Sequence, residues 1–95
     1  MSTLLTKHAL ARIRDRKFNK AIVVEIVDNP DYLFYDTKTK SFVAISSSEY
    51  GSQLRQISVF YHEDTRRNKI IRTFHPEDPK EIQNRIVKGR YIKVK

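Results

Sequence analysis

A histidine and two arginines, His8, Arg12 and Arg16, recur at four-residue intervals near the start of the chain. In a helix, this spacing places the three side chains on one stripe. Leu5, Ala9 and Ile13 lie on the adjoining stripe, so the basic row borders the face that is buried. Arginine binds phosphate in a fork geometry, and histidine moves a proton near neutral pH. The stripe therefore predicts either a site that binds and reworks a phosphate or a solvated basic helix face.

A second candidate group lies on the last two long β-strands that the sequence predicts. When these strands pair with His62 opposite Lys69, Arg72 falls on the apolar face of the hairpin. A buried arginine without a partner is strongly destabilising. Arg72 is therefore expected either to pair with a carboxylate such as Glu25 or to project into a cleft that an anion can enter. The other residues expected on that face are Ile57, Val59, Tyr61, Ile70 and Phe74.

Two histidines and a tyrosine accompany Arg72. His75 follows Arg72 and Thr73 at the strand end, where it is a candidate acid or base or a surface residue. Tyr61 is a candidate for stacking on a base or a core aromatic, and His62 is a candidate substrate contact. The three histidines of the chain lack metal-ligand spacing, and no carboxylate cluster accompanies them. No metal or other cofactor is expected.

Composition limits the class of protein. The 95 residues predict a single domain over residues 1–95, and the net charge of +8 predicts a polyanionic partner. RNA, DNA and an acidic protein all fit this charge. The chain has no cysteine, which excludes a disulfide framework and fits the cytoplasm. No apolar stretch resembles a signal peptide or a membrane span, so a cytoplasmic location without membrane attachment is expected.

The candidate residues depend on helices and strands that the pattern predicts. Residues 6–16 predict a helix that Thr3 or Thr6 can cap. The β-branched run in residues 19–28 favours a strand, whereas Asn19 as a cap and Pro30 as a stop favour a second helix, which we predict. Closely spaced strands with short polar turns follow, which is typical of an antiparallel meander. These strands are predicted over residues 32–35, 41–46, 54–62 and 69–75.

The C-terminal part of the chain predicts a third helix and a short strand. Asp78 and Pro79 begin the helix, and Gly89 ends it. Residues 90–95 predict a short edge strand whose lysines discourage pairing with other chains. The expected fold is α+β: two N-terminal helices packed on a four-stranded antiparallel sheet, then a C-terminal helix and a short strand.

Several of these features resemble a known family. The opening His8-Ala9-x-x-Arg12-x-x-x-Arg16, the second helix ending at Asn29-Pro30 and the strand Ile70-Ile71-Arg72-Thr73-Phe74 resemble a family of small uncharacterised domains. That family is placed beside BrnT and RelE in the bacterial toxin superfamily, and the resemblance covers residues 6–75. It implies a RelE-like fold of helices on a curved sheet, metal-independent RNA cleavage and an antitoxin partner. RelE opens with a strand before its helices, and no such strand is predicted here.

The leading hypothesis is a metal-independent endoribonuclease in which the RNA 2′-hydroxyl attacks the adjacent phosphorus. His8 or His75 would act as general acid or base, and Arg12 and Arg72 would stabilise the phosphoryl charge. Arg16 would anchor the RNA backbone. Two alternatives remain: a non-catalytic module that binds RNA, DNA or an acidic protein, and an interaction protein whose basic groove docks an acidic segment. An acidic antitoxin covering the groove would combine the last alternative with the first hypothesis.

Overall fold

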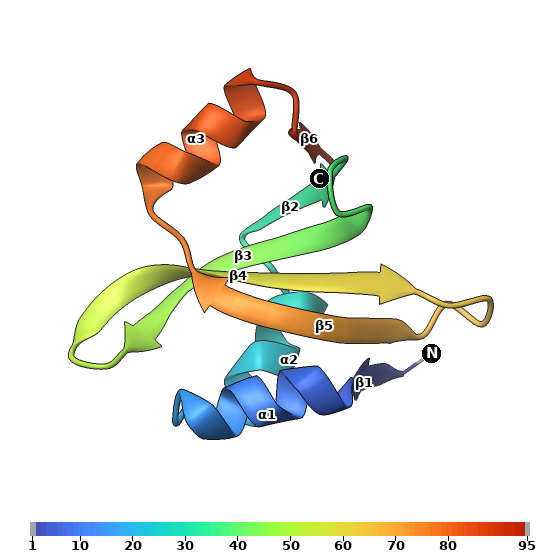
Figure 1. The fold of residues 1–95 in the computed structure, drawn as a ribbon, viewed down its shortest axis with the longest axis vertical. Coiled ribbons are helices and arrows are strands. Elements are labelled where there is room, and N and C mark those ends of the chain that lie inside the picture. Colours follow the sequence, from blue (N-terminus) through green and yellow to red (C-terminus); the bar gives the residue numbers. More distant parts are fainter. Residues whose placement is uncertain (1, 95) are drawn as a thin grey trace.

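The computed structural model describes residues 2–94, which form three helices and one six-stranded mixed sheet (Figure 1). The helices are α1 (Lys7–Asp15), α2 (Lys20–Asp28) and α3 (Pro79–Val87). The strands are β1 (Thr3–Leu5), β2 (Tyr32–Asp36), β3 (Ser41–Tyr50), β4 (Gln53–Glu63), β5 (Lys69–Pro76) and β6 (Tyr91–Lys93). Their order across the sheet is β1-β5-β4-β3-β2-β6, with β1 parallel to β5 and every other pair antiparallel. The α+β class is confirmed.

The prediction of a purely antiparallel, four-stranded sheet is wrong at both edges. β1 joins one edge beside β5, so the prediction that no strand precedes the first helix is also wrong. The predicted C-terminal edge strand forms, but it extends the sheet as β6 by pairing with β2. Each added strand has only three residues. A segment this short shows no usable period, and its pairing depends on a distant neighbour.

The three helices form where the sequence predicts them, because their ends carry local signals. Thr6 accepts a hydrogen bond from the Ala9 N–H at 3.1 Å and caps α1. Asn19 caps α2 in the same way, and Asp78 caps α3. Gly89 follows the last turn of α3 with φ of +78°, a left-handed conformation that glycine adopts without strain.

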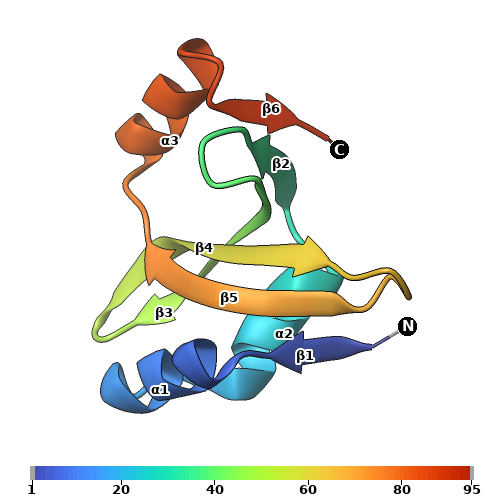
Figure 2. The same ribbon diagram turned by 45° about the vertical axis from the view of Figure 1, so that its right-hand side comes forward.

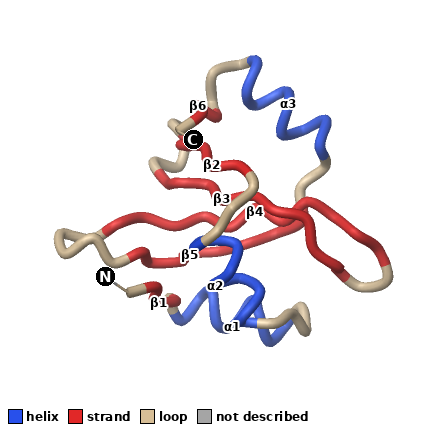
Figure 3. The backbone as a smooth tube through the Cα atoms, turned by 180° about the vertical axis from the view of Figure 1, so that it is seen from behind, coloured by secondary structure: helices blue, strands red, loops and turns tan. Residues whose placement is uncertain are grey.

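The helices lie on opposite sides of the sheet (Figures 1 and 2). α1 and α2 cover what we call the two-helix face, and α3 covers part of the opposite α3 face; the view from behind shows the same arrangement (Figure 3). The core under α1 and α2 consists of Ala9, Val23, Ile26, Val27, Ala44, Ile57, Val59, Tyr61, Ile71 and Phe74. The smaller core under α3 consists of Phe34, Val43, Ile45, Phe60 and Tyr91, with Ile82 and Ile86 packed against it.

β3 continues well beyond its predicted end. Ser47 and Ser48, which lie beyond the predicted strand end at residue 46, pair with β4, and the ladder extends to Tyr50 opposite Gln53. Serine favours turns, but cross-strand pairing outweighs that local preference here. The hairpin is held to the rest of the protein by Tyr50, whose ring lies 5.6 Å from that of Phe18.

Candidate functional site

A β-bulge in β5 decides where Arg72 points. Tyr61 of β4 pairs with Ile71, whereas the preceding residue, Phe60, pairs with Thr73. Arg72 is therefore the additional residue of the bulge. The insertion shifts the alternation of β5 by one position, so Arg72 and Thr73 both line a cleft on the α3 face.

The predicted register of this hairpin is wrong. His62 lies opposite Ile70 and not opposite the lysine that precedes it. Arg72 consequently leaves the apolar face on which it was expected, and it is solvent-exposed. The residues of β5 that do reach the two-helix core are Ile71 and Phe74, three positions apart, which strict alternation cannot place on one face. The additional residue of the bulge, Arg72, is what lets Ile71 and Phe74 reach the same face.

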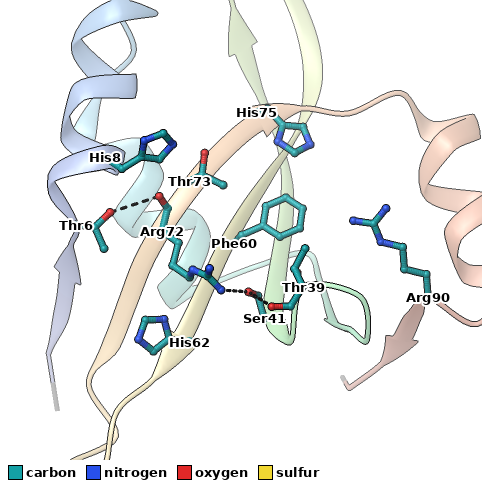
Figure 4. A pocket seen from close by; sticks show the side chains of 10 residues that line it. All are labelled: Thr6, His8, Thr39, Ser41, Phe60, His62, Arg72, Thr73, His75 and Arg90. Atoms are coloured by element: carbon teal, nitrogen blue, oxygen red, sulfur yellow. Dashed lines mark hydrogen bonds between the residues drawn. The ribbon is translucent and has the colours of Figure 1, made fainter.

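The N-terminus of α1 is bonded to this bulge. Thr6 donates its backbone N–H to the Ile71 carbonyl oxygen at 3.0 Å and its hydroxyl to the Arg72 carbonyl oxygen at 3.4 Å. The same hydroxyl oxygen accepts the capping bond from Ala9. One side chain thus begins the helix, holds the bulge and places His8 beside it (Figure 4).

The cleft on the α3 face has a volume of about 510 Å³ and contains all three histidines of the chain. His8 comes from α1, His62 from β4 and His75 from β5, and two arginines, Arg72 and Arg90, complete the basic lining (Figure 4). The remaining lining residues are Thr6, Thr39, Ser41, Phe60 and Thr73. The structure therefore brings His8, His62, Arg72 and His75 together, although they are far apart in the sequence.

The two arginines of the cleft differ in their partners. Arg90 donates to both carboxylate oxygens of the buried Asp36, at 2.9 and 3.0 Å. Arg72 donates to the Ser41 hydroxyl at 3.0 Å, and it takes part in none of the three ion pairs found within residues 2–94. Of the two outcomes expected for Arg72, the structure shows the open cleft and not a pairing with Glu25. Arg72 is thus the cleft arginine whose charge is available to an anion.

Asp36 is held as a carboxylate. Burial alone would raise the pKa of Asp36, but hydrogen bonds from the Arg90 guanidinium, the Thr39 hydroxyl and the Lys38 backbone N–H lower it to about 2. The ion pair therefore fixes Arg90 as part of the cleft wall.

His75 lies in a strongly cationic environment. Its ring stacks on that of Phe60, with centroids 5.2 Å apart, and its Nε2 atom lies 4.0 Å from the Glu77 carboxylate. Burial lowers the pKa of His75 below its ordinary value, and nearby guanidinium groups lower it further. These groups belong to Arg85, Arg16, Arg90 and Arg12. His75 is therefore neutral at pH 7 and able to accept a proton.

A buried carboxylate, Glu77, supports the cleft from behind. It accepts hydrogen bonds from the Ser58 hydroxyl at 2.6 Å and from the Tyr91 hydroxyl at 3.1 Å, and it forms an ion pair with Arg85 of α3. Tyr91 also accepts a hydrogen bond from Arg85 at 3.0 Å. These bonds join α3 and β6 to β4 and to the end of β5, directly behind His75.

The predicted stripe on α1 divides into three different roles. His8 lines the cleft, and its Nε2 atom accepts a hydrogen bond from Arg12 Nε at 3.3 Å, which places the His8 proton on Nδ1. Arg12 therefore orients His8 and does not itself line the cleft. Arg16 donates to the Phe74 carbonyl oxygen and lies 5.4 Å above that ring, so it ties α1 to β5.

Tyr61 lies on the opposite side of the sheet from the cleft. The prediction that it shares a face with Arg72 is wrong, because the bulge separates them. Tyr61 is only 3% exposed and stacks on Phe42, with centroids 5.4 Å apart. Burial, together with the Glu63 carboxylate, raises the pKa of Tyr61 to about 12. Its position is that of a core aromatic.

Several cleft residues carried no recognised signal in the sequence, namely Thr39, Ser41, Phe60 and Arg90. One signal was present: Val59, Phe60 and Tyr61 are consecutive apolar residues, and an unbroken apolar run indicates a strand covered on both faces. That pattern places Phe60 on the face opposite Val59, which is the cleft side.

Comparison of the chain with protein-family models, with curated proteins and with solved structures finds no match. Within residues 2–94, no cluster of three or more histidine or acidic side chains is arranged to hold a metal ion. None of the described helices has the length and apolar character needed to cross a membrane.

Proposed function

We propose that the protein is a metal-independent endoribonuclease, related to the BrnT and RelE toxins, whose active site is the cleft on the α3 face. One observation carries the proposal: Arg72, a cation without a carboxylate partner in residues 2–94, points into a cleft that holds all three histidines. Guanidinium and imidazole groups together supply what phosphoryl transfer from RNA requires without a metal, namely charge stabilisation and proton transfer.

His75 is the general base of this mechanism. It is neutral at pH 7 because burial and the surrounding guanidinium groups lower its pKa. Its ring takes the proton of the RNA 2′-hydroxyl while the 2′-oxygen forms a bond to the adjacent phosphorus. The bond from phosphorus to the 5′-oxygen breaks, leaving a 2′,3′-cyclic phosphate on one fragment and a 5′-hydroxyl on the other.

The leaving 5′-oxygen takes its proton from solvent water, and the proton taken up by His75 returns to solvent. Because Arg12 donates to the Nε2 atom of the neutral His8, the Nδ1–H of His8 is available as a hydrogen-bond donor that stabilises the charge on the leaving oxygen. Arg12 is thus a positioning residue that acts through His8. His62, at the other side of the cleft, contacts the substrate.

Arg72 binds the non-bridging phosphoryl oxygens, where negative charge develops in the transition state. Ser41 occupies one Nη atom of Arg72, which orients the guanidinium and leaves its other N–H groups for the phosphate. Arg16 keeps α1 bonded to β5 and adds to the positive field at His75. It supports the RNA site through this field and through the position of His8.

An acidic antitoxin is the proposed protein partner. The net charge of +8 and the unpaired Arg72 favour an acidic segment that covers the cleft and excludes RNA. Such a segment would inhibit cleavage without any change in the catalytic residues.

The test is cleavage of a labelled single-stranded RNA by the purified protein in EDTA. Cleavage is expected, with 2′,3′-cyclic phosphate ends, and an RNA carrying 2′-O-methyl groups at every position is expected to stay intact because it lacks the nucleophile. Cleavage of the methylated RNA would contradict the mechanism. Binding of RNA that remains intact would contradict the catalytic proposal and favour the non-catalytic binding module.

A further inference from the structure

Two basic turns lie at the same end of the sheet. One is the β2–β3 turn, residues 37–40, and the other is the β4–β5 turn, residues 64–68. Phe42 pairs with Tyr61, so β3 begins where β4 is about to end, and the two turns are neighbours across the sheet. Their exposed cations are Lys38, Lys40, Arg66 and Arg67.

Both turns adjoin the cleft. Thr39, which lies between the two lysines of the β2–β3 turn, lines the cleft, and so does His62, close to the end of β4 (Figure 4). A chain that occupies the cleft and leaves it at this end of the sheet therefore passes beside both turns.

Within residues 2–94, the exposed cations of these turns form no ion pair with the acidic residues beside them. Asp36 bonds to Arg90, which already forms the cleft wall. Asp64 accepts hydrogen bonds from the Arg66 and Asn68 backbone N–H groups, both at 2.8 Å, and from the Asn68 side chain at 3.0 Å. None of the ion pairs within residues 2–94 includes a cation of either turn.

The β4–β5 turn is ordered by its own hydrogen bonds. Asp64 and Asn68 bond to each other through their backbones at 3.0 Å, and the Ser2 backbone N–H donates to the Asn68 side chain at 2.9 Å. Arg67 takes a left-handed conformation with φ of +62°, as does Lys40 in the other turn with φ of +56°. Ordered turns lose less conformational entropy when they bind a ligand than mobile loops do.

We infer that the two turns form a phosphate track, defined as Lys38, Lys40, Arg66 and Arg67, that binds the backbone of single-stranded RNA where it leaves the cleft. This inference rests on the proposed function for the identity of the ligand. It adds that the substrate is longer than the cleft and that affinity depends on nucleotides away from the scissile phosphate.

The test measures binding apart from cleavage. A fluorescent 12-nucleotide oligouridylate with 2′-O-methyl groups keeps its phosphates and cannot react, and its affinity is measured by anisotropy between 50 and 300 mM salt (about a sixfold range). The variants are Lys38→Gln/Lys40→Gln and Arg66→Gln/Arg67→Gln. The control, Arg14→Gln/Lys20→Gln, removes the same charge at the junction of α1 and α2, at the opposite end of the molecule from the β4–β5 turn (Figure 1).

Loss of two phosphate contacts is expected to reduce the slope of log affinity against log salt by about 1.4, or about 25-fold in affinity at 0.1 M salt. The control is expected to keep the wild-type slope. A methylated trinucleotide, which reaches little beyond the cleft, is expected to bind the wild type and both turn variants equally.

Wild-type slopes in both turn variants would overturn the track, as would an equal change in the control variant or no binding of the 12-mer by the wild type. The proposed function can fail separately. Altered slopes without cleavage of unmodified RNA would uphold the track and remove the endoribonuclease. Cleavage of unmodified RNA, with wild-type salt slopes in both turn variants, would uphold the endoribonuclease and remove the track.

Discussion

The two faces of the sheet differ in how they are closed. On the two-helix face, α1 and α2 cover a continuous apolar core that includes the fully buried Val23, Val59 and Phe74. On the α3 face, the apolar core is smaller, buried acidic groups such as Glu77 and Asp36 lie beside it, and part of the face is an open cleft. One face of the sheet is thus covered by apolar packing, and the other carries the polar groups and the cleft.

The bulge in β5 makes this division possible within a single strand. Ile71 and Phe74 reach the two-helix core, while Arg72, Thr73 and His75 line the cleft. A regular strand would send alternate residues to each face and would bury the arginine or expose the phenylalanine. The comparison predicts that substitutions behind each face have separable effects on folding and on RNA cleavage.

The largest expected effect on stability comes from Glu77→Gln, which breaks the polar part of the α3 face. The substitution leaves Arg85 beside a neutral amide, and removing one partner of a buried ion pair is expected to reduce the free energy of unfolding by about 3 kcal/mol. Urea unfolding measures this change. Glu81→Gln, on the exposed part of the same helix, is the matched control, and equal stability of the two variants would contradict the role given to Glu77.

The link between the two faces is tested by Thr6→Ala. This variant removes both the cap of α1 and the hydroxyl bond to the bulge, so we expect a loss of about 1–2 kcal/mol in the free energy of unfolding and slower RNA cleavage. Thr6→Ser keeps the hydroxyl and is expected to retain most of the wild-type stability and most of the wild-type cleavage rate. Identical behaviour of the Ala and Ser variants would show that the hydroxyl is not what holds the bulge.

The titration of His75 is expected to have a smaller effect on the free energy of unfolding. Its pKa in the folded protein lies below the ordinary value of 6.5, so the unfolded chain takes up this proton first as the pH falls. The contribution of His75 to stability is therefore complete above pH 6.5 and is lost as the pH falls through the folded-state pKa. Unfolding of the wild type and of His75→Asn between pH 5 and 7.5 (about one unit or more on each side of the ordinary pKa) measures this contribution. A stability difference that grows in favour of the wild type toward low pH would contradict it.

The smallest effect is expected from Tyr61→Phe, which sharpens the distinction between the faces. The Tyr61 ring is part of the two-helix core, and its hydroxyl makes no hydrogen bond within residues 2–94. We expect the RNA cleavage rate to stay at the wild-type level and the free energy of unfolding to change by less than about 1 kcal/mol. A large fall in cleavage with normal stability would return Tyr61 to the substrate site.

The parts of the fold that the sequence predicts are those with local causes. Thr6, Asn19 and Asp78 begin their helices through hydrogen bonds to backbone groups only two or three residues away. The long strands follow from β-branched and aromatic runs. The short β1 was not predicted, and β6 was predicted as a strand but not as a neighbour of β2, because both pairings depend on strands remote in the chain.

In the candidate site, too, the sequence predicts only what has a local cause. His8, His62, Arg72 and His75 could be selected by residue type, and the structure brings them to one cleft. Their common location depends on the bulge, and a single additional residue in a ladder leaves no distinct mark on the pattern of β5. The partners of Arg90 and Glu77 depend in turn on the packing of α3, which no local pattern specifies.

Arg72 on the open cleft is proposed to stabilise the transition state of RNA cleavage, and single-turnover kinetics of an Arg72 variant test this role. Single-turnover cleavage of labelled single-stranded RNA in EDTA is compared for the wild type, Arg72→Ala and Arg14→Ala, the last of which removes an exposed arginine of α1 that does not line the cleft. Loss of a group that stabilises transition-state charge is expected to slow Arg72→Ala by about 10²–10³-fold, while Arg14→Ala cleaves at the wild-type rate. Cleavage by folded Arg72→Ala at the wild-type rate, or an equal loss of cleavage in both variants, would contradict a catalytic role for Arg72.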